Sequence, residues 1–85
     1  MLIRSQDKKT LVNLDNTNAI CIYECDTGFT VDAWGVSIDY EIGEYSTEEK
    51  AIKVLDMICD SCRNTAFIDE QAVVFQMPQD EEVEV

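Results

Sequence analysis

The sequence contains no histidine, and this absence excludes several kinds of functional site. Without an imidazole, neither a Ser-His-Asp nor a Cys-His catalytic arrangement can form, and the commonest metal ligand is missing. Basic residues are also scarce: 6 Lys and Arg stand against 18 Asp and Glu, for a formal net charge of −12. Direct binding to nucleic acid is not expected, because that affinity depends on basic groups facing phosphates.

Long apolar runs and glycine-rich loops are missing as well. No run approaches the ~20 apolar residues that a membrane span needs, so we expect no membrane association. The first nine residues do not resemble a secretory signal, because the apolar stretch that such a signal needs is interrupted by the charged residues Arg4, Asp7, Lys8 and Lys9. No glycine-rich phosphate loop is present. We therefore expect a cytoplasmic, non-enzymatic protein that carries no cofactor and no metal.

The clearest element is a helix predicted over residues 47–63. Ser46 and Glu49 have the spacing of a capping box, in which each side chain bonds the backbone N–H of the other residue. An apolar stripe at helical spacing consists of Ala51, Val54, Leu55, Ile58 and Cys62. One helix cannot bury such a stripe by itself, so the rest of the chain must supply the opposing surface.

The remaining pattern predicts short strands at residues 1–5, 10–14, 19–25, 29–33, 36–45 and 71–77. This order indicates an α+β fold, an antiparallel sheet of five to six strands with the one long helix packed on one face. Residues 1–78 form a single domain in this prediction, and residues 79–85 form an acidic flexible tail. The expected core comprises Ala51, Val54, Leu55, Ile58, Ile20 or Cys21, Ile38, Tyr40 and Phe75.

Three stretches carry a resemblance to other proteins: LIRSQDKKTLVNLDN at 2–16, GEYSTEEKAIKVLDMI at 43–58 and FQMPQDEEV at 75–83. They resemble a group of short uncharacterised proteins of Gram-positive Firmicutes and their phages or prophages. Residues 17–35 carry no part of the resemblance. Because the group has no assigned activity, the resemblance implies a context only. An inhibitor of a host system, encoded by a mobile element, is one role that analogy suggests.

Four cysteines occur as two pairs, Cys21 with Cys25 and Cys59 with Cys62. Four thiolates could hold zinc, but residues four apart on a strand lie about 13 Å apart, too far for two Zn–S bonds of ~2.3 Å. Cys59 and Cys62 share a helix face in the last turn, where the helix dipole does not lower a thiol pKa. We expect reduced thiols, with metal binding and disulfide formation as less favoured alternatives.

The charge distribution is the strongest functional signal. From Thr10 to Glu49 there is no Lys or Arg. The same segment holds nine acids, namely Asp15, Glu24, Asp26, Asp32, Asp39, Glu41, Glu44, Glu48 and Glu49. Asp39 and Glu41 fall on one face of a predicted strand, and Asp32 joins them if its own strand turns its apolar residues to the core.

Two function classes follow from this acidic surface. In the first, the protein is an interaction module whose partner site is Asp32, Asp39 and Glu41. Its partner would be a basic host protein surface, one that normally holds nucleic acid. In the second, it is a small structural or ligand-binding homodimeric protein, and the negative charge serves solubility alone.

Overall fold

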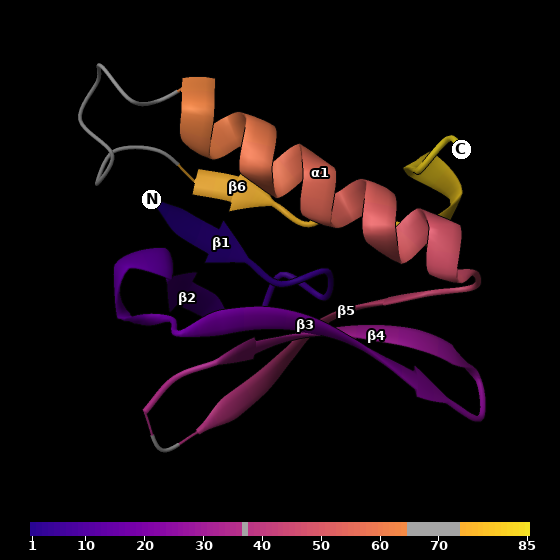
Figure 1. Cartoon of the computed structure of the whole chain (residues 1–85), viewed down its shortest axis with the longest axis horizontal. Helices are drawn as coiled ribbons and strands as arrows, with labels where there is room; N and C mark the ends of the chain where they lie inside the picture. The colour runs from indigo at the N-terminus through magenta and orange to yellow at the C-terminus, as the bar shows by residue number, and fades with distance from the viewer. Residues whose placement is uncertain (37, 65–73) are drawn as a thin grey trace.

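The computed structural model describes residues 1–36, 38–64 and 74–85 and shows an α+β fold in which one helix lies over two small sheets (Figure 1). The larger sheet is an antiparallel meander with the order β3–β4–β5. Its strands are β3 (Ala19–Cys25), β4 (Gly28–Trp34) and β5 (Asp39–Tyr45). A short 3₁₀ turn, η1 (Leu14–Asn16), precedes β3.

The smaller sheet has the order β2–β1–β6. Its strands are β1 (Leu2–Arg4), β2 (Leu11–Asn13) and β6 (Val74–Gln76). The α+β class is confirmed, but the single antiparallel sheet is wrong: the described strands divide into two sheets of three, and β1 pairs with β6 in parallel. No continuous ladder of the described strands joins the two sheets. Among the described residues, Gln6 links the β1–β2 connection to β5, in part by donating its N–H to the carbonyl of Ile42 at 2.8 Å.

The helix α1 (Glu48–Asn64) packs against all three strands of the larger sheet. Its cap differs from the predicted box. The hydroxyl of Thr47 accepts a hydrogen bond from the N–H of Lys50 at 3.2 Å, which satisfies one donor of the first turn. Ser46 donates instead to the carboxylate of Asp80, from its N–H and from its hydroxyl. The tail, not a local box, therefore completes the start of this helix.

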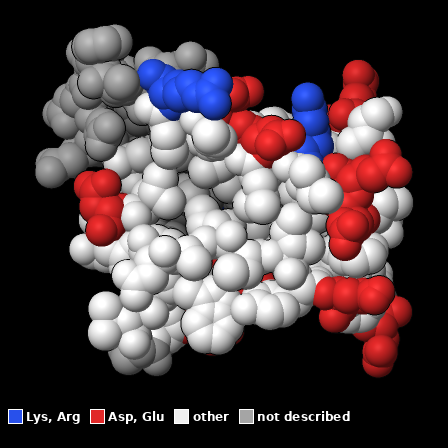
Figure 2. All heavy atoms as spheres, in the orientation of Figure 1, with Lys and Arg blue, Asp and Glu red and all other residues white. Residues whose placement is uncertain are grey.

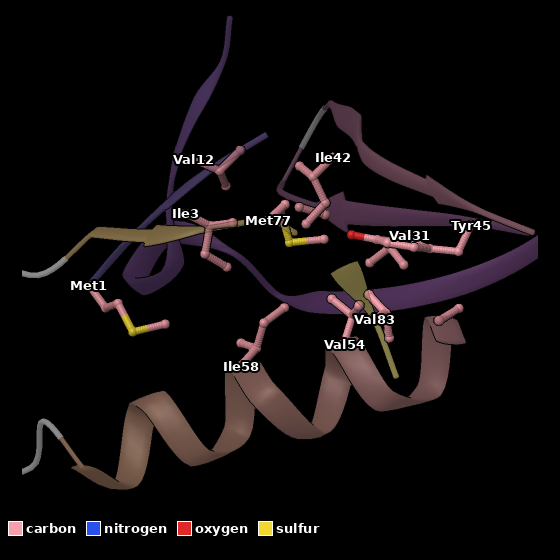
Figure 3. Close-up of a cluster of buried hydrophobic side chains, with 12 residues drawn as sticks. Met1, Ile3, Val12, Val31, Ile42, Tyr45, Val54, Ile58, Met77 and Val83 are labelled. Carbon is pink, nitrogen blue, oxygen red and sulfur yellow. The ribbon is translucent and has the colours of Figure 1, made fainter. Parts of the chain in front are cut away.

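The core lies where α1, the larger sheet and the smaller sheet meet (Figure 3). Its largest fully buried side chains are Tyr45, Ile3, Ile42, Met77, Val31 and Val54. Of the predicted core residues, Ala51, Val54 and Ile58 are buried. Leu55, Ile20 and Phe75 are partly buried and pack against the cluster.

Two predicted core positions are wrong, because Ile38 and Tyr40 are 55% and 45% exposed. β5 begins only at Asp39, so Ile38 belongs to the connection from β4. Tyr40 lies opposite Ala33 at the start of β5, where it borders a hollow of about 220 Å³ beside β2 instead of packing under α1. Ser37 and residues 71–73, which the prediction also placed in strands, lie outside the described residues.

A β-bulge in β5 changes which side chains reach the core. Val31 pairs with Gly43 and Asp32 with Glu41, so Ile42 is an extra residue in β5. In such a bulge two neighbouring residues lie opposite one, and both can face the same side. Ile42 and Gly43 are accordingly both buried.

Residues 79–85, predicted as a flexible tail, pack against the domain. They include a 3₁₀ turn, η3 (Asp80–Glu82), and Val83 is only 5% exposed. Just before them, the carbonyl of Pro78 accepts a 2.8 Å hydrogen bond from the hydroxyl of Tyr45. The two valines of this acidic run, Val83 and Val85, do not form a helical or strand pattern with earlier apolar residues, so the sequence could not reveal this packing.

Candidate functional site

The face of the β3–β4–β5 sheet that is turned away from α1, called the outer face below, carries the predicted site. Because alternate residues of a strand share a face, the strand register places side chains in rows across it. These rows are Tyr23–Thr30–Glu44, Cys21–Asp32–Glu41 and Ala19–Trp34–Asp39. The opposite face, called the inner face, packs on α1 and carries Ile20, Ile22, Phe29, Val31 and Ala33.

The structure brings the three predicted site residues together on the outer face. Asp32 and Glu41 are direct neighbours on paired strands, and Asp39 lies opposite Trp34 in the adjoining row. Along β5, Asp39 and Glu41 are two residues apart, a separation of about 6.7 Å on one strand face. Like charges in directly opposed positions repel each other, so this arrangement costs stability.

Two further acids belong to the same electrostatic neighbourhood. Burial raises the pKa of Glu41, and the charges of Asp32, Glu44 and Asp7 raise it further, in that order of size. Strict alternation would put Glu44 on the face opposite Glu41, but the bulge at Ile42 returns it to the same face. Asp7 arrives from the β1–β2 connection, which no local pattern in the sequence would have placed beside β5.

Asp32 has an unusual environment for an acid. The residue is half-buried, and its Oδ1 atom is buried without a hydrogen-bond partner in the parts of the chain that the structure describes. A buried carboxylate oxygen is normally satisfied, since leaving it without a partner is costly.

An aromatic pair spans the outer face: Tyr23 and Trp34 belong to the two rows on either side of the Cys21–Asp32–Glu41 row. The rings of Tyr23 and Trp34 are 6.3 Å apart between centroids, at an interplanar angle of 51°. Their exposed fractions are 45% and 39%, so both rings remain available to a partner. Burial, followed by the neighbouring Cys21, raises the pKa of Tyr23, so its hydroxyl stays protonated at neutral pH. From the sequence, Trp34 beside Gly35 is expected to pack in the core or at an edge, with an interface role as the alternative if it is exposed; its pairing with Tyr23 was not predicted.

Within residues 1–36, 38–64 and 74–85, no ion pair involves Asp32, Asp39, Glu41 or Glu44. The ion pairs found there join Lys50 to Asp80 at 3.5 Å and Arg63 to Asp60 at 3.9 Å, both away from the outer face. Carboxylates beside exposed aromatic rings are a combination that recognises cations, because a guanidinium or ammonium can bond the carboxylate while stacking on a ring.

The four cysteines lie on two different elements of the fold. Cys21 and Cys25 lie on β3, Cys59 and Cys62 lie on α1, and no disulfide joins any of the four. In the described segments, no three His, Cys, Asp or Glu residues are grouped so that they could hold a metal ion. No described helix is long and apolar enough to cross a membrane.

Comparison with known proteins adds no relative to this picture: the chain matches no protein-family model, no curated protein and no solved structure.

Proposed function

We propose that this protein is a non-enzymatic, cytoplasmic interaction module that presents its outer face to a Lys- and Arg-rich surface of another protein. Surfaces that normally hold nucleic acid have this character, and an acidic protein that covers one would block it. The resemblance to phage and prophage proteins favours a host protein as the partner and inhibition as the result.

One observation carries the proposal: Asp32 lies directly opposite Glu41, neither forms an ion pair with a described basic residue, and the exposed rings of Tyr23 and Trp34 lie beside them. If the acids served solubility alone, they could be dispersed over the surface. The repulsion between Asp32 and Glu41 and the exposed aromatic area would then not be needed. Aromatic residues are enriched where proteins bind each other, and charge complementarity accelerates the encounter of the partners.

The test uses an arginine-rich peptide as the probe, since a guanidinium suits both the carboxylates and the rings. The chain has a single Trp, and it lies on the outer face, so its emission reports whether that face is occupied. Binding and association rate are measured as salt is varied, for the original chain and for the triple variant Asp32→Asn, Asp39→Asn, Glu41→Gln. We expect the variant to lose affinity and most of the salt dependence of the association rate.

A second triple variant, Asp56→Asn, Glu81→Gln and Glu84→Gln, removes the same number of charges from other exposed positions. If both triple variants lose affinity equally, the binding follows net charge alone and the outer face is not the site. If Trp34 emission does not respond to bound peptide, the same conclusion holds.

Homodimer formation, the alternative from the sequence, is tested on the same samples. The exposed rings of Tyr23 and Trp34 favour it, because a second copy could cover them. Self-pairing of the outer face would, however, bring two sets of Asp32, Asp39 and Glu41 together. Light scattering at rising protein concentration should therefore show a monomer, and a stable dimer that protects Trp34 would support the alternative.

A further inference from the structure

The two edges of the β3–β4–β5 sheet are treated differently by the fold. At the β5 edge, Gln6 donates its backbone N–H to the carbonyl of Ile42 at 2.8 Å. Its side-chain amide donates to the carbonyl of Glu44 at 3.1 Å and accepts the Glu44 N–H at 2.9 Å. The edge of β5 is thus covered. At the other edge, β3 pairs only with β4 among the described strands.

The hydrogen-bond pattern shows which groups of β3 face the open edge. The N–H of Gly35 donates to the carbonyl of Ile38 at 2.8 Å, so the odd-numbered residues along β4 bond towards β5. The even-numbered residues of β4 then bond β3, where the register pairs them with odd-numbered partners. Ile20, Ile22 and Glu24 consequently turn their backbone N–H and C=O groups to the open edge.

β3 has little of the usual protection of an edge strand. It is seven residues long, contains no Pro, Lys or Arg, and is rich in apolar side chains. In natural sheets, Pro and charged residues such as Lys on an edge strand normally prevent it from pairing with a strand of another chain. The one charge is Glu24, which lies on the inner face opposite Phe29. An inward carboxylate on an edge strand disfavours pairing with an equally acidic strand, including a second copy of β3.

A groove lies beside this edge, between β3 and the start of α1. It has a volume of about 430 Å³ and is lined by Ile22, Glu24, Phe29, Glu48 and Ile52. Two β3 residues, Ile22 and Glu24, line this groove, and the same two residues turn their backbone N–H and C=O groups to the open edge. Figure 2 shows acidic side chains gathered at the end of the molecule where α1 begins and β3 turns into β4. No basic residue lines the groove.

We propose that β3 accepts an extended, basic peptide segment of another protein as an added strand, with alternate side chains of that segment in the groove. The backbone of Ile20, Ile22 and Glu24 supplies the hydrogen bonds. An apolar side chain of the peptide packs on Ile22 and Ile52, and a Lys or Arg lies between Glu24 and Glu48. Main-chain bonds give affinity in this mode, and the groove gives the preference for apolar and basic side chains. The outer face is not required.

The probe is a short blocked peptide in which Val and Lys occupy alternate inward positions, separated by Thr. The readout is amide hydrogen exchange of the full chain by NMR. Bound peptide should slow the exchange of Ile20, Ile22 and Glu24, since these amides gain partners. Two versions of the peptide, N-methylated on alternate sets of amides, test the strand geometry: one should lose binding and the other retain it.

The charge preference is tested with Glu24→Gln, Glu48→Gln, compared with Glu81→Gln, Glu84→Gln. The groove variant should bind the peptide about three- to tenfold more weakly, the size expected from two exposed ion pairs, and the control should bind as before.

Unchanged exchange of the three amides on binding, or equal binding of both methylated peptides, would overturn the proposal. If these amides become protected without peptide, and more so as the protein concentration rises, then a second copy of the chain pairs with the β3 edge and the peptide proposal is wrong. The measurement does not involve the outer-face residues, so its failure and that of the interaction module are distinguishable.

Discussion

The carboxylate of Asp80 accepts two hydrogen bonds from Ser46, one from the backbone N–H at 2.8 Å and one from the hydroxyl at 3.1 Å. Lys50 adds a third contact, because its Nζ donates to the carbonyl of Asp80 at 3.0 Å. An acid at the start of α1 also interacts favourably with the helix dipole. A residue near the end of the chain thereby fixes the point where β5 passes into the helix.

Replacing Asp80 by Asn should destabilise the protein at neutral pH and not in acid. The hydrogen bond from the Ser46 N–H, aided by the Ser46 hydroxyl and Lys50, lowers the pKa of Asp80 from its ordinary value of 3.8. An acid with a lowered folded-state pKa stabilises the fold above its ordinary pKa, and this contribution is lost as pH falls through the folded value. Thermal unfolding is measured across pH, with Glu84→Gln as the control. The difference in melting temperature between the original chain and Asp80→Asn should shrink as the pH falls below the ordinary pKa of 3.8. A difference that does not change with pH would contradict this.

Glu41→Gln should have the opposite effect and raise the melting temperature at neutral pH. Burial, with the charges of Asp32, Glu44 and Asp7, raises the pKa of Glu41 above its ordinary value of 4.5. The ionised form is therefore less favourable in the folded than in the unfolded chain, so stability falls as pH rises through the folded pKa. The gain should vanish at low pH and diminish in high salt, which screens the repulsion. A loss of stability at neutral pH would show that Glu41 has a stabilising partner.

Ile42→Ala should cost more than Leu55→Ala. Ile42 is 1% exposed at the bulge, whereas Leu55 lies partly exposed at the border of the core. Deleting a fully buried Ile side chain costs about 2–5 kcal/mol of unfolding free energy, and a partly exposed site loses less. Urea unfolding of both variants measures the two values. Equal losses would mean that the bulge does not direct Ile42 into the core.

Gly28→Ala should destabilise the β3–β4 hairpin, and Gly35→Ala provides the matched control. Gly28 has φ of +145°, and an added Cβ would lie 2.5 Å from the carbonyl oxygen of Tyr45. The same addition at Gly35 meets its nearest atom at an ordinary 3.4 Å. We expect a loss of about 1–3 kcal/mol for Gly28 from backbone strain alone, and little change for Gly35. Comparable melting temperatures of the two variants would exclude this role for Gly28.

Features that depend on local periodicity were predictable from the sequence. The helix was predicted over 47–63 and is observed as Glu48–Asn64, because its apolar stripe and start signal lie within one segment. The predicted strand 19–25 is observed with the same bounds. The shared face of Asp32, Asp39 and Glu41 also follows from strand alternation and a hairpin.

Features that depend on how distant segments meet were not predictable. The bulge at Ile42 has no signature in the residues around it, yet it moves Glu44 to the outer face. The division into two sheets depends on which strand lies beside β1, and strand pattern alone does not encode that choice. Glu24 shares parity with Ile22, but its place in a groove depends on where α1 lies across the sheet.

The parallel pairing of β1 with β6 has a consequence for how the chain folds during synthesis. Leu2 pairs with Val74 and Arg4 with Gln76, so nearly the whole chain separates the partners. The β1–β2 hairpin alone is too small to be stable in water, whereas the meander has neighbouring strands in sequence order. Closing a long loop also costs entropy before any contact repays it. A ribosome therefore releases β1 early, and Ile3 stays without its β6 neighbour until the segment that contains Phe75 has left the exit tunnel.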